Sequence, residues 1–172
     1  QHRPHTVTKM KIFKDIFSND ELLSDSFAFK DVGDCVYEVE AQYINQTVGD
    51  YDIGANPAEG DESYESTTTR VINVVDAHRL MKTTFDKKSF VNYFRAYLKK
   101  VKAHLDAKNP ERSVAFKKAA QEFVTKSIMP KFDAFEFLMG ENMAEYSMVS
   151  LLFHGGADGA TPFLWYMKYG MY

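Results

Sequence analysis

The side chains that could support catalysis in this chain of 172 residues are few and scattered. His78, His104 and His154 lie far apart and lack the short spacing of paired metal ligands. Cys35 is the only cysteine, which excludes an internal disulfide and an all-cysteine zinc site. The sequence has no phosphate-binding glycine loop and no nucleophile elbow. These features argue against an enzyme, and we predict no obligatory cofactor.

An acidic segment at residues 45–66 has the best set of potential cation ligands. It is poor in apolar residues, so it cannot bury enough surface to offset the entropy cost of ordering, and we predict a flexible loop. Its carboxylates are hard oxygen ligands, but their spacing does not follow the EF-hand pattern. The segment is therefore either a solubilising loop or a weak calcium site made of Asp50, Asp52, Glu59, Asp61, Glu62 and Glu65.

Charge is divided unequally along the chain. Residues 82–131 contain thirteen basic and four acidic residues, whereas the rest contains eight basic and twenty acidic residues. Such a division indicates either two surfaces with different electrostatic partners or a solvated helical face. We do not expect a nucleic-acid partner, because the remaining chain is acidic and the aromatic residues of this region are needed in its core.

Residues 10–172 are expected to form one domain, and Met10 resembles a natural start. Residues 1–9 are interpreted as added sequence or an extension. They have no apolar centre typical of a secretory signal, and no apolar run approaches the length of about 18 residues that a membrane span needs. The single cysteine fits an intracellular protein.

Strands are predicted on both sides of a helical region. Residues 35–43 alternate, with Cys35, Tyr37, Val39, Ala41 and Tyr43 on one face, where a structural thiol is expected. Further strands are predicted at residues 10–15, 67–75, 132–139, 148–153 and 162–168. Residues 18–23 resemble a capped turn or short helix, with Ser18 as N-cap and Glu21 at the third position.

A helical hairpin is predicted at residues 86–129. Asp86 can cap a helix with apolar residues at helical spacing from Phe90 to Leu105. Asn109 and Pro110 then end one helix and begin the next. The second apolar stripe consists of Val114, Ala119, Ala120, Phe123, Val124 and Ile128. The short turn requires nearly antiparallel helices, so the fold class is α+β.

Five motifs resemble the translationally controlled tumour protein (TCTP) family, in the right order and over residues 10–172. They are Met10-Lys-Ile-Phe-Lys-Asp-Ile-Phe-Ser-Asn-Asp-Glu21, Ile53-Gly-Ala-Asn-Pro-Ala-Glu-Gly60, Asn109-Pro-Glu-Arg112, Phe135-Glu-Phe-Leu-Met-Gly-Glu-Asn-Met143 and Asp158-Gly-Ala-Thr-Pro162. The resemblance implies a β-tent core like that of Rab-binding chaperones and methionine sulfoxide reductase B. A projecting antiparallel α-helical hairpin and a flexible acidic loop would complete the fold.

The resemblance also implies several partners. Glu21 and Glu141 align with family glutamates implicated in binding a Ras-like small GTPase, Rheb, in growth and translation control. The lysine-rich hairpin resembles the family's tubulin-binding region, which here contains Lys87, Lys99, Lys100, Lys102, Lys117 and Lys118. The same resemblance implies weak calcium binding and, as further partners, anti-apoptotic and translation elongation proteins. It also implies a cytoplasmic location, with nuclear forms and forms secreted without a signal peptide.

Three alternatives remain. Residues 29–34 mimic a helix that docks into anti-apoptotic grooves, but Val32 to Asp34 precede a strand and are predicted to be a turn. The protein could instead be a calcium- and microtubule-linked cytoskeletal module without a GTPase role. The third alternative is an enzyme like methionine sulfoxide reductase, although the zinc ligands of that family are missing.

Overall fold

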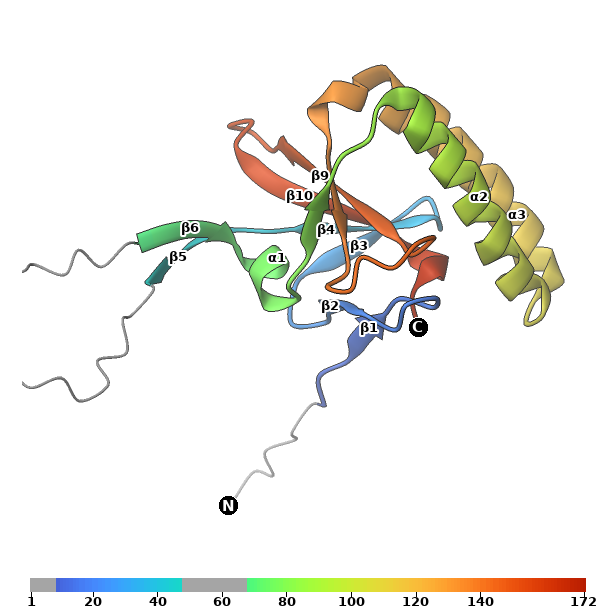
Figure 1. The fold of residues 1–172 in the computed structure, drawn as a ribbon, viewed down its shortest axis with the longest axis horizontal. Helices are drawn as coiled ribbons and strands as arrows, with labels where there is room; N and C mark the ends of the chain where they lie inside the picture. Colours follow the sequence, from blue (N-terminus) through green and yellow to red (C-terminus); the bar gives the residue numbers. More distant parts are fainter. Residues whose placement is uncertain (1–8, 48–67) are drawn as a thin grey trace, which may run out of the picture.

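The computed structural model describes residues 9–47 and 68–172 of the chain. The fold is α+β, as predicted, with a six-stranded antiparallel sheet in the order β3-β4-β10-β9-β8-β7 (Figure 1). Its strands are β3 (Phe29–Val32), β4 (Val36–Glu40), β7 (Met81–Thr83), β8 (Glu136–Met139), β9 (Val149–Gly155) and β10 (Thr161–Met167). Two strand pairs flank this sheet: β1 (Ile12–Lys14) with β2 (Glu21–Ser24), and β5 (Tyr43–Thr47) with β6 (Thr68–Ile72).

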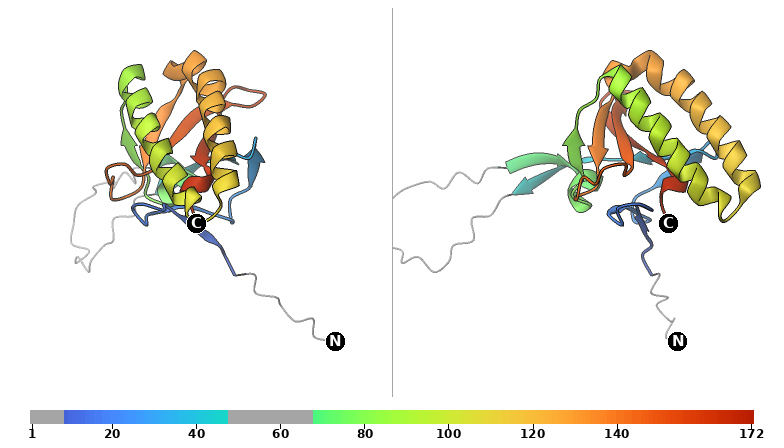
Figure 2. Two further views of the ribbon diagram at one scale, coloured as in Figure 1. Left: turned by 90° about the vertical axis from the view of Figure 1, so that its right-hand side faces the viewer. Right: turned by 45° about the vertical axis from the view of Figure 1, so that its right-hand side comes forward.

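A helical hairpin projects from one side of the sheet (Figures 1 and 2). It consists of α2 (Lys87–Asp106) and α3 (Pro110–Phe123), followed by the π-helical turn η1 (Val124–Ile128) and the 3-10 helix η2 (Met129–Ala134). Asp86 caps α2 by accepting a hydrogen bond from the Ser89 amide, 2.7 Å away. Asn109 caps α3 through the Arg112 amide at 3.2 Å. Both predicted caps are confirmed.

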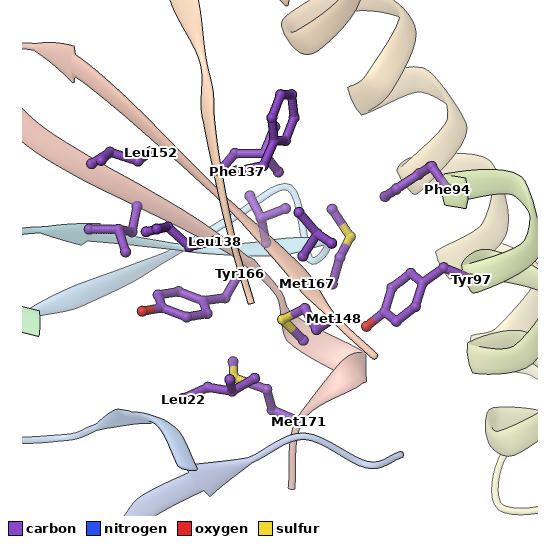
Figure 3. Packing of buried hydrophobic residues seen from close by; sticks show 14 of the residues in the cluster. Leu22, Phe94, Tyr97, Phe137, Leu138, Met148, Leu152, Tyr166, Met167 and Met171 are labelled. Atoms are coloured by element: carbon purple, nitrogen blue, oxygen red, sulfur yellow. The ribbon is translucent and has the colours of Figure 1, made fainter. Parts of the chain in front are cut away.

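The core lies between the sheet and α2. Phe94 and Tyr97 of α2 approach Phe137, Met148 and Met167 of the sheet region (Figure 3). All five are among the buried residues of one apolar cluster, and the buried positions of α2 recur every three or four residues. Burial of this apolar stripe, rather than helix propensity alone, holds α2 to the sheet.

Of the two alternatives predicted for residues 18–23, a capped turn or a short helix, the helix is wrong and Ser18 lies in a turn. The Asp15 carboxylate accepts hydrogen bonds from the amides of Phe17 and Ser18, and the Ser18 hydroxyl accepts one from the Asp20 amide at 3.3 Å. These bonds close a tight turn, and β2 follows with Leu22 and Leu23 buried. Ser18 thus bonds to the backbone as a turn residue and not as a helix N-cap.

Several predicted boundaries are also wrong. The strand at 35–43 divides into β4 and β5, because β5 leaves the main sheet to pair with β6. The strand at 67–75 ends at Ile72, where the short helix α1 (Asn73–Ala77) begins. The strand at 132–139 is shortened, since η2 occupies its first residues. Residues 45–47 of the predicted loop belong to β5, and residues 48–66 lie outside the described part.

Residues 29–32 form strand β3, and a turn with positive φ at Gly33 and Asp34 follows. The prediction of a turn rather than a docking helix at residues 32–34 is therefore confirmed. The N-terminal region also contacts the C-terminus: the Lys14 and Tyr172 backbones exchange two hydrogen bonds of 3.0 Å. Both ends of the domain are thereby attached to one side of the core.

The apolar stripe predicted for the second helix is wrong only at Val114: Ala120 and Ile128 are buried, and Ala119, Phe123 and Val124 pack partly buried against the core. Val114 is 64% exposed, whereas Ser113, Phe116 and Ala120 are the buried residues of α3. Ser113 can be buried because its hydroxyl donates to the Pro110 carbonyl at 2.8 Å and to the Asp106 carboxylate. Phe116 packs edge-on against Tyr169, with ring centroids 5.1 Å apart.

Replacing Phe116 by alanine should therefore lower the free energy of unfolding by about 3–5 kcal/mol, the usual range for a buried phenylalanine. Val114→Ala, on the exposed side of the same helix, should change it by no more than about 0.5 kcal/mol. Urea denaturation of both variants measures the difference. Equal losses would mean that the phase of α3 is misassigned.

Candidate functional site

The structure brings Glu21 and Glu141 into one surface pocket, although they are far apart in sequence. The pocket has a volume of about 390 Å³ and is lined by Asn19, Asp20, Glu21, Ala77, His78, Arg79 and Glu141. We call it the acidic pocket. Its residues come from the turn before β2, the end of α1 and the loop after β8. Glu21 and Glu141 are both exposed, so a partner can reach their carboxylates.

Asp20 holds two walls of the acidic pocket together. Its side chain is 7% exposed and accepts hydrogen bonds from the Asn142 side-chain amide at 2.5 Å and the Asn142 backbone amide at 3.3 Å. Gly140 leaves room for this contact, since a Cβ atom there would lie 2.4 Å from Asp20 Oδ2. In the sequence, Glu141 lies between Gly140 and Asn142, and Glu21 follows Asp20. The contact therefore sets the position of both glutamates.

Asp15, which is buried, makes a second contact between the turn before β2 and the end of the loop that follows β8. Its carboxylate is 1% exposed and accepts the Met148 amide at 2.7 Å, in addition to the amides of Phe17 and Ser18. A buried carboxylate is tolerated when amide donors satisfy its oxygens. The turn that carries Asn19 and Asp20 is thus attached to the start of β9 by a second contact.

Two residues of the acidic pocket have strained backbone. Asn19 has a φ of 64° and Arg79 a φ of 53°, in the left-handed region that non-glycine residues rarely adopt. Met143 and Tyr146, in the loop after Glu141, also have positive φ and are exposed. Such strain persists where the surrounding contacts over-determine a conformation, and it is concentrated at functional sites.

Arg79 supplies the positive charge of the acidic pocket. Its guanidinium lies 3.3 Å from the Glu141 carboxylate, and both side chains are largely exposed. An exposed pair of this kind contributes only about 0–1 kcal/mol. A partner's cation can therefore compete with Arg79 for Glu141. The sequence analysis missed Arg79, because nothing in its neighbours indicates that residues 77–79 would meet the loop after β8.

His78 lines the same pocket without a hydrogen bond to either ring nitrogen among the described residues. Its ring packs edge-on against Phe27, with centroids 5.9 Å apart. Burial lowers the pKa of His78 from its usual 6.5, and the nearby charge of Glu21 opposes part of that effect. The folded protein therefore favours the neutral imidazole.

The predicted tubulin-binding lysines divide into three groups. Lys99, Lys102 and Lys117 line a groove between α2 and α3. Lys87 and Lys118 are exposed but do not line it. Lys100 instead lies over the rings of Phe17 and Tyr146, 4.9 and 4.7 Å from their centroids. Exposure of Lys99, Lys117 and Lys118 agrees with the expected solvated face.

The predicted calcium ligands, from Asp50 to Glu65, lie outside the described residues. Within residues 9–47 and 68–172, no three His, Cys, Asp or Glu side chains are grouped so that they could hold a metal ion. Cys35 is 2% exposed, and burial raises the pKa of its thiol to about 12. No helix in the described part is long and apolar enough to cross a membrane.

The neutral state of His78 predicts a pH dependence. A lowered histidine pKa stabilises the fold above the unfolded-state value of about 6.5, and this contribution is lost as the pH falls toward the folded-state pKa. From about pH 7.5 to about pH 5.5, the wild type should lose more unfolding free energy than His78→Phe. Urea denaturation at both pH values measures this. A larger loss in the variant would instead mean that Glu21 stabilises the imidazolium.

Known proteins resemble this chain over nearly its whole length. The family profile described as translationally controlled tumour protein matches residues 10–172. Homologues from Mycosarcoma maydis and Saccharomyces cerevisiae are 47% and 45% identical over 164 residues, which cover 94% of this chain and 97% of each relative.

Two solved structures have the same fold. The tumour-associated protein p23fyp from Schizosaccharomyces pombe has a TM-score of 0.79 at 41% identity, with 95% of this chain and 98% of that chain covered. The protein from Caenorhabditis elegans has a TM-score of 0.68 at 32% identity, with 95% and 97% covered. The five motifs, the sheet with its projecting hairpin and these relatives agree, and the chain belongs to the translationally controlled tumour protein family.

Proposed function

We propose that this protein is a regulatory binding protein that docks to a Ras-like small GTPase of the Rheb type through the acidic pocket. The observation that carries the proposal is the convergence of Glu21 and Glu141 on that pocket. The two glutamates belong to different sequence motifs, which the fold brings to one surface. The proposal concerns binding and does not include catalysed nucleotide exchange.

The charge of the acidic pocket favours a basic partner surface. Asp20, Glu21 and Glu141 supply three carboxylates, against the single guanidinium of Arg79. Asp20 is engaged with Asn142, so the two exposed glutamates are the groups that a partner's lysine or arginine would meet. Complementary charges of this kind guide association and set the orientation of a complex.

Two exposed apolar side chains lie in the loop that follows Glu141. Met143 is 41% exposed and Tyr146 is 45% exposed, both in the loop that follows Glu141. Methionine and tyrosine are enriched at protein interfaces, where apolar contact surrounds the polar anchors. Met143 thus offers apolar contact area two residues from Glu141, whereas the Tyr146 ring lies under Lys100 of α2.

An enzyme of the reductase type fits the structure less well. Such chemistry needs a reactive thiolate, but the thiol of Cys35 is buried and its raised pKa keeps it protonated at neutral pH. We therefore propose a non-enzymatic role in the cytoplasm. Weak calcium binding by the acidic segment at residues 45–66 stays a prediction.

Neutralising the acidic pocket should weaken GTPase binding without unfolding the protein. Glu21→Gln and Glu141→Gln should each cost about 2–5 kcal/mol of binding free energy if the charge meets a partner cation in a desolvated contact. Their melting temperatures should change little, because both side chains are exposed. Calorimetric titration with a Rheb-type GTPase in its GDP and GTP forms measures the affinity.

Glu145→Gln is the matched control, since it removes an exposed carboxylate in the same loop but outside the acidic pocket. It should bind like the wild type. Equal affinities for all three variants and the wild type would contradict the proposed site.

A second candidate function is binding to tubulin through the hairpin. It is favoured by the exposure of Lys99, Lys117 and Lys118 on α2 and α3. These cations can meet an acidic protein surface, such as that of a microtubule. Lys100 is less free to do so because it lies over two aromatic rings.

Reversing the charge of Lys99, Lys117 and Lys118 to glutamate should weaken microtubule co-sedimentation at low salt by about tenfold or more, equal to about 1.4 kcal/mol. Binding by the wild type should fall steeply as salt is added. Circular dichroism should show unchanged helicity, since the three side chains are exposed. Unchanged co-sedimentation at low salt would count against the tubulin proposal, and lost helicity would mean that the face was misplaced.

A further inference from the structure

A long groove separates the exposed sides of α2 and α3. Its volume is about 930 Å³, and α2 lines it at every third or fourth position from Val91 to Asp106. At a rise of about 1.5 Å per residue, this stripe is about 22 Å long. Its full lining is Val91, Phe94, Arg95, Leu98, Lys99, Lys102, Ala103, Asp106, Lys117, Gln121, Val124 and Thr125. We call it the hairpin groove; the left view of Figure 2 shows α2 and α3 from the hairpin side.

The hairpin groove lies beside the core-facing surface of α2. Arg95 directly follows the buried Phe94, and Lys99 directly follows the buried Leu98. Consecutive helix residues are about 100° apart around the axis, so the groove stripe is turned by about this angle from the face that packs on the sheet. Lys99 and Lys117 are exposed, and the groove is therefore open to solvent.

An apolar floor and a basic rim make up the hairpin groove. Phe94, Leu98, Val91 and Val124 provide apolar side chains, to which the aliphatic stems of the lysines add. The rim carries Arg95, Lys99, Lys102 and Lys117, whereas Asp106 is the one carboxylate among the described residues that line it. Asp106 is already engaged by Lys102 at 2.8 Å and by the Ser113 hydroxyl. The groove therefore has a net positive charge.

An apolar floor with a basic rim fits an acidic amphipathic helix of a partner better than a disordered acidic tail. A disordered acidic tail needs only the cations, and it would use Lys118 as readily as Lys117. An amphipathic helix instead places an apolar stripe on the floor and acidic flanks against the rim. A groove about 22 Å long accepts about four helical turns.

We propose that the hairpin groove is a docking site for an acidic amphipathic helix of a partner protein. The proposal goes beyond tubulin binding by the lysines, because it requires the apolar floor and distinguishes between neighbouring lysines. Lys117 lines the groove, whereas Lys118, the next residue, is exposed outside it. Ala103 lines the groove from an exposed position on α2, whereas Ala115 is exposed on α3 outside it.

The test uses a designed peptide with leucines at helical spacing on one face and glutamates beside them. A length of about 18 residues allows appreciable helix formation. Its affinity for the full chain is measured by fluorescence anisotropy, with a scrambled peptide of the same composition as reference. The wild type should bind the amphipathic peptide at least about tenfold more tightly than the scrambled one.

Two pairs of variants test the position of the peptide. Lys117→Glu, which reverses a rim charge, and Ala103→Trp, which fills the groove, should each weaken binding by about tenfold. The controls Lys118→Glu and Ala115→Trp should stay within about twofold of the wild type. All four changes are at exposed positions, and circular dichroism checks that the hairpin remains folded.

Three outcomes would overturn the proposal: no binding of the amphipathic peptide at about 1 mM, a limit that corresponds to about 4 kcal/mol; equal binding of the scrambled peptide; or equal losses in Lys117→Glu and Lys118→Glu. The last two would show diffuse charge attraction without use of the groove. Microtubule co-sedimentation of the same variants is a separate measurement. The tubulin proposal is judged by that result alone and does not depend on the peptide binding.

Discussion

The contact on which the acidic pocket depends is the one between the Asp20 carboxylate and the loop at Gly140–Asn142. Asp20 is nearly buried, and the side chain and backbone of Asn142 satisfy its oxygens. An unsatisfied carboxylate at this depth would be costly, so the turn before β2 and the loop after β8 must stay together. Glu21 and Glu141 are adjacent to this contact in sequence. Their closeness in space therefore follows from a structural need that has nothing to do with a partner.

The acidic and the basic surface of the protein are formed by different helices, strands and loops. The acidic pocket is built from the β2 turn, the end of α1 and the loop after β8, whereas the basic residues gather on α2 and α3. In Figure 1 and in the right view of Figure 2, α1 lies away from the hairpin. A basic partner and an acidic partner could therefore bind without competing for the same residues. The division of charge along the sequence becomes a division between surfaces.

Elements with local signals could be predicted from the sequence, and those set by distant contacts could not. The α2 stripe and the caps at Asp86 and Asn109 are local, and the structure confirms them. At the start of α3, Val114 was predicted to be buried in place of Ser113, because a serine is expected to be exposed unless an acceptor such as Asp106 takes its hydrogen bond. Likewise, local signals left a capped turn and a short helix open for residues 18–23, and the distant contact of Asp15 with Met148 holds the segment as a turn. Arg79 and His78 reach the acidic pocket only through the packing of α1.

The measurement that tests this account most directly is GTPase affinity in Gly140→Ala. The change alters no charge, but its Cβ would lie 2.4 Å from Asp20 Oδ2, so the two walls of the acidic pocket must move apart. Gly155→Ala is the control, since its Cβ would meet Phe163 at an ordinary 3.4 Å. The account predicts that Gly140→Ala loses about 1–3 kcal/mol of stability and that its folded molecules bind the GTPase as weakly as Glu21→Gln. A folded Gly140→Ala protein that binds like the wild type would contradict it.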